Sequence, residues 1–164
     1  MVDWSKYFYY ENGHLFRKIA TGPTTRVGEK VGGLDDKGYI TVRCNNTKFK
    51  AHRIIWEMHF GKIPENYEID HIDRNKTNNN LENLRLATRS QNVRNISITS
   101  KNKSGYKGVS WNKQVSKWVV QIRQNKIKKH IGYFDNVIEA AKAYDNALKS
   151  IDPIYGNFNF GENK

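Results

Sequence analysis

The sequence predicts an α+β protein built from three small parts, and three observations predict it. Residues 1–50 hold short aromatic and β-branched runs separated by turn-forming residues, as an antiparallel β-module would. Residues 51–97 hold two strand patterns around a polar loop, followed by a helix pattern, which gives a ββα unit. Residues 98–164 hold three strand patterns and one helix pattern. A polar hinge at 97–104 (SITSKNKS) separates the second part from the third.

Composition restricts the class of partner. The 164 residues include 28 Lys and Arg against 16 Asp and Glu, a formal charge of +12. Such an excess indicates a polyanionic partner, with nucleic acid as the first expectation, and the basic residues within 1–50 would extend along it as a DNA-contacting module. Aromatic residues make up 12% of the chain, too many for a disordered tail. The single Cys44 excludes an internal disulfide and a cysteine-cluster zinc site.

The sequence offers no membrane or secretion signal. No run approaches the roughly 20 apolar residues that a spanning helix needs. The first residues, MVDWSKYFYYENG, lack the basic and then apolar pattern of a signal sequence. We therefore expect a protein that is not secreted and has no membrane partner. It would act in the cytoplasm, or in the host cytoplasm if a phage encodes it.

A basic stretch in the last part alternates apolar and polar residues. It contains nine Lys or Arg and no acid between Lys101 and His130. The alternation predicts three strands near 107–111, 117–123 and 128–134, with turns at 112–116 and 124–126. A period of two places Trp118, Val120 and Ile122 on one face of the middle strand. Lys117, Val119, Gln121 and Arg123 fall on the other.

One helix is predicted after the third strand. Asn136 suits the N-cap, and Glu139 follows it three residues later. The apolar positions at 137, 140, 141, 144, 147, 148 and 151 follow helical spacing. Asp152-Pro153 ends the helix. We expect the three-stranded antiparallel sheet to be packed on this helix through one face, which leaves the other face bare and basic.

This part resembles the plant ethylene-response-factor type of DNA-binding domain. The resemblance rests on YKGV at 106–109, KWVVQIR at 117–123, IGYFD at 131–135, EAAKAYD at 139–145 and NFNF at 157–160. It implies that the bare sheet face enters the major groove of DNA. The DNA-facing residues carried over by position are Lys107, Ser110, Asn112, Gln121, Arg123, Lys128 and His130. Several Arg and Trp contacts of that family are Lys, Ser, Asn or His here, so the base sequence that is read does not follow.

The middle part carries residues suited to chemistry. Residues 68–72 alternate as a short strand that presents Asp70 and His71 at its end. A polar loop, a returning strand at 83–87 and a helix through 91–95 follow. Asn83 lies twelve residues after His71, and Asn92 lies twenty-one after it.

This spacing resembles the HNH endonuclease motif in the variant that ends in Asn. With HRIIW at 52–56, Phe60-Gly61 and Pro64 upstream, it is similar to the phage- and intron-encoded HNH homing endonucleases. The resemblance implies that Asn83 holds the loop in place, and that His52 supports the site rather than performing chemistry. It covers residues 51–95.

Phosphodiester hydrolysis gives the remaining residues their expected roles. His71 suits a general base near neutral pH. Asp70 and Asn92 offer oxygen ligands for a divalent cation, magnesium first and manganese as a second choice. With only two protein ligands, the cation would bind weakly until DNA phosphate oxygens complete its coordination shell. The expected phosphate contacts of this part are Arg74, Lys76, Arg85, Arg89 and Arg94.

We therefore expect a metal-dependent, site-specific endonuclease that cuts or nicks double-stranded DNA. It would act as a monomer with no protein partner. A DNA-binding regulator with an inactive nuclease site is the alternative. A basic RNA- or ribosome-binding protein also fits the charge, but it leaves the spacing of Asp70, His71, Asn83 and Asn92 without a reason.

Overall fold

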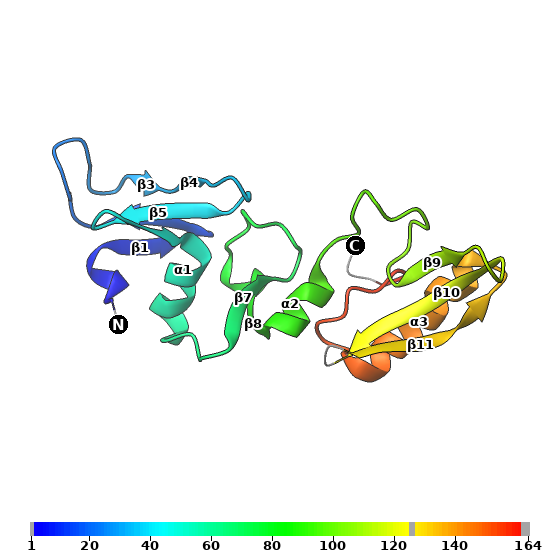
Figure 1. Cartoon of the computed structure of the whole chain (residues 1–164). Coiled ribbons are helices and arrows are strands. Elements are labelled where there is room, and N and C mark those ends of the chain that lie inside the picture. Colours follow the sequence, from blue (N-terminus) through cyan, green and yellow to red (C-terminus); the bar gives the residue numbers. More distant parts are fainter. Residues whose placement is uncertain (1, 125–126, 162–164) are drawn as a thin grey trace. The chain divides into compact units, whose positions relative to one another are not determined.

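The computed structural model describes residues 2–124 and 127–161 (Figure 1). It divides into two compact units, Met1–Arg89 and Ser90–Lys164. The chain combines small antiparallel sheets with helices, so the predicted α+β class is confirmed. The predicted turn at 124–126 includes residues 125 and 126, which lie outside the described residues.

Two small antiparallel sheets open the first unit. The first contains β1 (Phe8–Glu11), β2 (His14–Arg17) and β3 (Lys30–Val31), preceded by a 3-10 turn at Trp4–Lys6. The second contains β4 (Gly33–Leu34), β5 (Ile40–Cys44) and β6 (Thr47–Lys50). Both hairpin turns, Asn12-Gly13 and Asn45-Asn46, have positive φ at their two central residues, as tight hairpins of this twist require.

A helix and a hairpin complete the first unit. Helix α1 (Ala51–Phe60) follows β6 without a linker and ends at Gly61, whose φ is 80°. Strand β7 (Tyr67–His71) pairs antiparallel with β8 (Leu84–Thr88), and a 3-10 turn at Leu81–Asn83 leads into β8. The loop between the two strands is the predicted polar loop.

One hydrophobic core joins these elements. Its buried side chains include Phe8 of β1, Leu15 of β2, Ile54 of α1, Ile69 of β7 and Leu84 of β8. The expected boundary between residues 50 and 51 therefore falls inside a shared core. The β-module is the packing partner of the ββα part, because a hairpin and one helix bury too little apolar surface alone.

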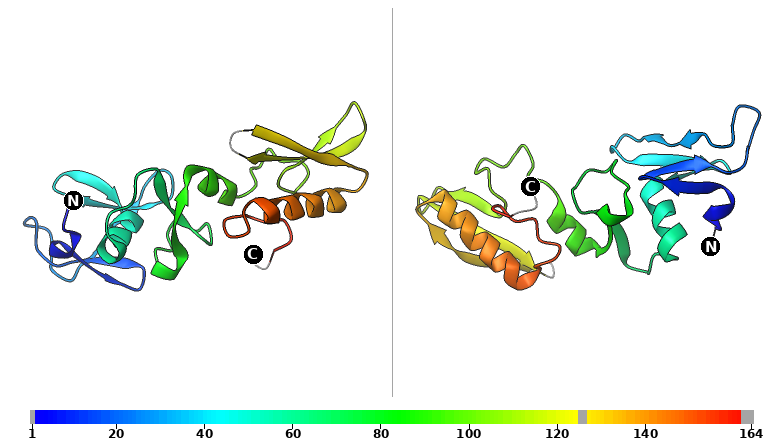
Figure 2. Two further views of the ribbon diagram at one scale, coloured as in Figure 1. Left: turned by 90° about the horizontal axis from the view of Figure 1, so that it is seen from below. Right: turned by 180° about the vertical axis from the view of Figure 1, so that it is seen from behind.

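The second unit contains α2 (Arg89–Asn95) from Ser90 onward, three strands and one long helix. The antiparallel sheet has the order β11–β10–β9, with bounds Val109–Asn112 (β9), Lys117–Gln124 (β10) and Ile127–Phe134 (β11). Helix α3 (Val137–Ile151) runs along one face of this sheet, as Figure 2 shows from two sides. The three predicted strands and the predicted helix are confirmed.

The N-cap of α3 and the packing of its buried face explain its position. The side chain of Asn136 accepts hydrogen bonds from the backbone N–H groups of Ile138 and Glu139, so the predicted N-cap is confirmed. Ala140, Ala141, Tyr144 and Leu148 pack against Val109, Val120 and Ile122 of the sheet.

Within the described residues, no helix has the length and apolar character needed to cross a bilayer.

Candidate active site and nucleic-acid interface

The carboxylate of Asp70 is buried against an arginine. Asp70 lies opposite Arg85 in the β7–β8 ladder. Nε and Nη2 of Arg85 both lie 2.9 Å from Oδ2 of Asp70. Asp70 is 5% exposed. The sequence placed Arg85 among the phosphate contacts, whereas the structure directs its guanidinium to this carboxylate.

The adjacent His71 faces the other side of the hairpin, as successive strand residues do. Its Nε2 lies 2.9 Å from Oδ1 of Asn79 in the following loop. With the amide oxygen as acceptor, Nε2 carries the proton and Nδ1 carries the lone pair. Burial lowers the pKa of His71, while the bond to Asn79 and the carboxylates of Asp73 and Asp70 act in the opposite direction. The imidazole is thus neutral near pH 7, the form that accepts a proton.

Asn79 is a site residue that sequence reasoning missed. It is 2% exposed and holds the candidate base directly. In the sequence it stands in the run Asn78-Asn79-Asn80, where composition indicates only a loop. Its position eight residues after His71 is the signal that could have suggested it.

Asn83 closes the loop between the two strands. Its Oδ1 accepts a hydrogen bond from the backbone N–H of Asp73 at 3.0 Å. Its Nδ2 donates to Oδ1 of Asp73 at 2.9 Å and to the carbonyl of Asn78 at 2.8 Å. The side-chain amide is therefore engaged within the loop, which is the holding role that the resemblance implies.

His52 lies beside His71. The two ring centroids are 4.9 Å apart in an edge-to-face arrangement, and the ring of Tyr39 lies 5.4 Å from that of His52. His52 is 4% exposed, and its Nδ1 has no hydrogen-bond partner in the described part of the chain. Burial, with repulsion from His71, lowers the pKa of His52 to about 3. A neutral, fully packed ring at this place fits a supporting role.

The remaining residues of the predicted motif lie on or near α2. Asn92 is half-buried in α2 and belongs to the second unit. Nε and Nη2 of Arg94 lie 2.8 and 2.5 Å from Oδ2 of Asp152. Arg94 is therefore held by a carboxylate of its own unit and does not extend toward solvent as a phosphate contact would. Arg89 is exposed, and Arg74 is half-buried with a φ of 66°.

Sharing of one ion by Asp70 and Asn92 stays a prediction. Among the described residues, no group of three or more His, Cys, Asp or Glu side chains could hold a metal. The donor set that the motif provides is instead one carboxylate and one amide oxygen. Such hard oxygen ligands fit a magnesium ion that keeps most of its water or phosphate ligands.

The sheet face opposite α3 carries most of the expected DNA-facing residues. Ser110, Gln121, Arg123, Lys128 and His130 are all exposed. In the ladder Gln121 lies opposite His130, and Arg123 lies opposite Lys128, so these side chains form two rows on one surface. A β-bulge between Val120 and Gln121 bends β10 at this point.

Two residues of the same set are used within the unit. Nζ of Lys107 donates to the carbonyls of Arg94 and Ile96, which directs this side chain away from the exposed row. Asn112 is half-buried, and its Oδ1 accepts from the backbone N–H of Gln114 at 2.9 Å, which shapes the β9–β10 turn. The sequence led us to expect Lys107 on the DNA-facing surface. In the structure its side chain instead contacts the backbone of Arg94 and Ile96.

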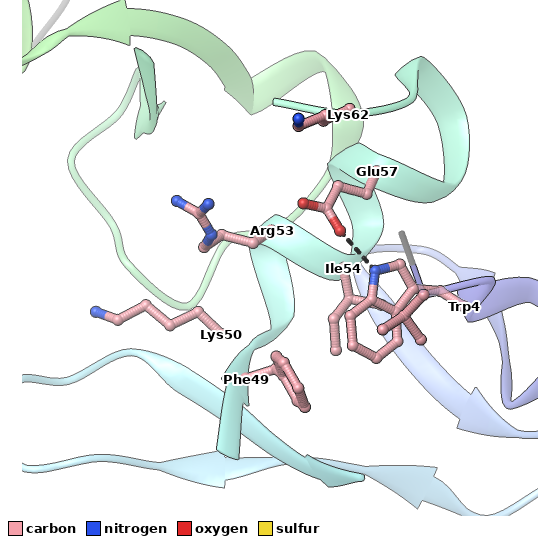
Figure 3. Close-up of a pocket in the computed structure, with 8 residues that line it drawn as sticks. Trp4, Phe49, Lys50, Arg53, Ile54, Glu57 and Lys62 are labelled. Atoms are coloured by element: carbon pink, nitrogen blue, oxygen red, sulfur yellow. Dashed lines mark hydrogen bonds between the residues drawn. The ribbon is translucent and has the colours of Figure 1, made fainter. Parts of the chain in front are cut away.

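A cavity of about 470 Å³ lies beside α1 and is distinct from the histidines (Figure 3). Trp4, Phe49 and Ile54 form its apolar wall, and Nε1 of Trp4 donates to Glu57 at 2.6 Å. The lining of this cavity does not include Asp70 or His71. We therefore place the candidate chemistry at the end of β7.

Family models match two segments of the chain. Residues 49–94 match an HNH endonuclease model, and residues 104–153 match an AP2 domain model. The first segment contains the Asp70–His71 hairpin, and the second contains the sheet and most of α3. The resemblances to HNH endonucleases and to the ethylene-response-factor domain are thus confirmed.

The chain is also similar to three individual viral proteins. The chain is 45% identical over 69 residues to Protein 3.8 of Escherichia phage T7, which covers 42% of this chain and 57% of that protein. It is 39% identical over 113 residues to an uncharacterized HNH endonuclease of Acanthamoeba polyphaga mimivirus, covering 68% of this chain and 57% of that protein. It is 32% identical over 84 residues to the uncharacterized gene 5.3 protein of Enterobacteria phage T3, covering 48% of this chain and 80% of that protein.

The structure is also similar to that of the HNH homing endonuclease I-HmuI. The likeness covers 76% of this chain and 71% of that chain, with a TM-score of 0.43 and 24% sequence identity. By the family matches, the chain carries an HNH endonuclease domain followed by an AP2 domain.

Proposed function

We propose that this protein is a metal-dependent endonuclease that cleaves or nicks double-stranded DNA at specific sites, as a homing enzyme does. The observation that carries the proposal is a buried, neutral His71, oriented by Asn79 at the end of the strand that also carries Asp70. The positive charge of the chain and its AP2 domain support DNA as the substrate.

In this scheme His71 acts as the general base. Its Nδ1 takes a proton from a water molecule while the water oxygen forms a bond to the phosphorus of the scissile phosphate. The bond between phosphorus and the leaving 3′ oxygen breaks, and that oxygen takes a proton from solvent. His71 then returns its proton to solvent. Asn79 keeps the ring in the tautomer that this step needs.

Asp70 and Asn92 would hold the divalent cation, with magnesium as the first choice. Both contacts from Arg85 fall on Oδ2 of Asp70, so the arginine orients the carboxylate. A bound cation would stabilise negative charge on the phosphate and on the leaving oxygen. Asn83 contributes indirectly, because its amide fixes the loop that follows His71.

The AP2 domain would supply specificity. We propose that the exposed face of its sheet lies in the major groove, with Ser110, Gln121, Arg123, Lys128 and His130 toward DNA. Arg74 and Arg89 remain proposed phosphate contacts of the HNH domain. One chain contains both the reading and the cutting parts, so a monomer without a protein partner suffices.

The proposal is tested by measuring whether the protein converts a supercoiled plasmid that carries the target site to the nicked or linear form. We expect nicked or linear product with magnesium and no product with EDTA. The variant Asp70→Ala should respond only weakly to added magnesium. Binding of the plasmid without product at any magnesium or manganese concentration would contradict the proposal and favour a DNA-binding regulator with an inactive site.

A further inference from the structure

We propose that Tyr39, Lys50 and Lys76 form a binding site for a DNA backbone phosphate next to His71. The inference rests on the proposed function in taking DNA as the ligand and, for the identity of the phosphate, in taking His71 as the base. Three separate segments build the site: Tyr39 directly precedes β5, Lys50 ends β6, and Lys76 lies in the loop between β7 and β8.

The ring of Tyr39 holds both lysines. Nζ of Lys50 lies 3.4 Å from the ring centroid, and Nζ of Lys76 lies 4.7 Å from it. Nζ of Lys76 also donates to the carbonyl of Lys37 at 2.8 Å. Cation–π contacts of this kind position flexible ammonium groups without neutralising them. Two positive charges are therefore held in place around one aromatic ring.

In the described part of the chain, these charges form no ion pair with a carboxylate. Within the described residues, no ion pair involves Lys37, Lys50, Arg53 or Lys76. Burial lowers the pKa of Lys50, and Lys37, Lys76 and Arg53 lower it further, against the opposing effect of Asp35. In Figure 3 the side chains of Lys50 and Arg53 extend to the same side, away from Trp4. A bound polyanion would relieve this repulsion.

The position of the cluster identifies which phosphate it would bind. The ring of Tyr39 lies 6.1 Å from that of His71 and 5.4 Å from that of His52. An anion on the two ammonium groups would thus lie beside the candidate base. Because DNA presents phosphates at regular intervals, the geometry fits a phosphate neighbouring the scissile one, held by compact lysine charges rather than by base contacts.

Salt dependence of DNA binding tests the site directly. The dissociation constant of the full chain for a duplex is measured in EDTA at a series of salt concentrations. Each phosphate contact contributes about 0.9 to the slope of log K against log salt. We expect the double variant Lys50→Gln/Lys76→Gln to reduce the magnitude of this slope by about 0.9, and each single variant to reduce it by part of that amount, on target and unrelated duplexes alike.

Matched variants separate this effect from folding and from general loss of charge. Lys6→Gln removes the same charge at an exposed position that pairs only weakly with Asp3, and should leave the slope unchanged. Lys50→Arg should keep the slope of the unmodified chain. Tyr39→Phe should bind as the unmodified chain does, whereas Tyr39→Leu should bind more weakly.

Wild-type slopes for both Lys50→Gln and Lys76→Gln would overturn the inference, even in a chain that nicks DNA. A chain that never nicks DNA, but whose slope falls in these two variants and not in Lys6→Gln, would keep the phosphate site and refute only the nuclease proposal. The binding measurement contains EDTA, so its outcome is independent of cleavage.

Discussion

The Nε2 atom of His71 lies 2.9 Å from Oδ1 of Asn79, and both side chains are buried. This contact connects the last residue of β7 to the loop that follows it. It fixes the orientation of the imidazole and leaves Nδ1 as the nitrogen that would face a reacting water in the proposed mechanism. The loop is held in turn by Asn83, so the position of the candidate base depends on two side-chain amides.

Asn79→Ala should therefore lower the rate of cleavage with little change in DNA affinity. Misplacement of a catalytic group by about 1 Å costs on the order of 100-fold, and we expect a loss of this size in kcat. Asn79→Asp keeps an acceptor for Nε2 and should lose less. Single-turnover cleavage and equilibrium binding separate the two effects. Cleavage by Asn79→Ala at the unmodified rate would remove Asn79 from the positioning role.

Gly108 should tolerate no side chain. Its φ is +73°, and an added Cβ would lie 2.0 Å from the ring of Tyr144 in α3. Gly108→Ala combines backbone strain with overpacking and should lower the free energy of unfolding of the second unit by about 3 kcal/mol. Gly105→Ala is the control, because Gly105 has a φ of +75° with nothing within 4 Å of an added Cβ. Urea denaturation should show a larger loss for Gly108→Ala, and equal losses would contradict the packing argument.

The ion pair between Arg94 and Asp152 should stabilise the second unit. The side chains of Arg94 and Asp152 are 16% and 7% exposed, so removal of one partner leaves the other as a largely buried, unpaired charge. We expect Asp152→Ala to cost about 3 kcal/mol. Lys117 and Asp135 form an exposed pair in the same unit, with 42% and 82% exposed side chains, and Asp135→Ala should cost less than about 1 kcal/mol. Thermal or urea unfolding of the two variants would refute this ranking if Asp135→Ala proved the more damaging.

Acid should weaken the first unit through His52. Burial lowers the pKa of His52 to about 3, below its ordinary value of 6.5. The unfolded chain therefore binds a proton that the folded chain excludes, and the contribution of His52 to stability is full above pH 6.5. It is lost as pH falls toward 3, by about 2 kcal/mol at pH 5.

Unfolding free energies measured between pH 7 and pH 5 test this linkage. The unmodified chain should lose more stability over this range than His52→Gln, whose side chain does not titrate. The comparison uses the change with pH, so a lower absolute stability of the variant does not affect it. Parallel pH profiles would show that His52 takes up its proton at an ordinary pKa.

Local pattern was sufficient to predict much of the fold. The alternation along β10 and the N-cap at Asn136 led to the correct sheet and helix of the second unit. The hairpin turns at Asn12-Gly13 and Asn45-Asn46 consist of residues that favour positive φ, as turn chemistry requires. Strands β3 and β4 were missed, because two residues each are too few for any period to be visible. The core shared across residue 50 was missed because it consists of contacts between distant segments.

For the candidate site, too, some side chains could be predicted from the sequence and others could not. Spacing placed Asp70 and His71 on one strand and Asn83 at the end of their loop. Spacing does not reveal the partners of charged side chains, so Arg85, Arg94 and Lys107 were assigned to DNA although each contacts a group within its own unit. The binding role proposed for Tyr39 was not predicted, because the lysines over its ring come from β6 and from the β7–β8 loop.

The rate at which His71→Ala cuts a target-bearing plasmid in magnesium, measured beside its affinity for the same DNA, decides the mechanism. Loss of a general base typically costs about 10²–10⁴-fold, so the variant should nick at less than about a hundredth of the unmodified rate while binding unchanged. Magnesium-dependent nicking by His71→Ala at the full rate would show that the proton is taken by another group.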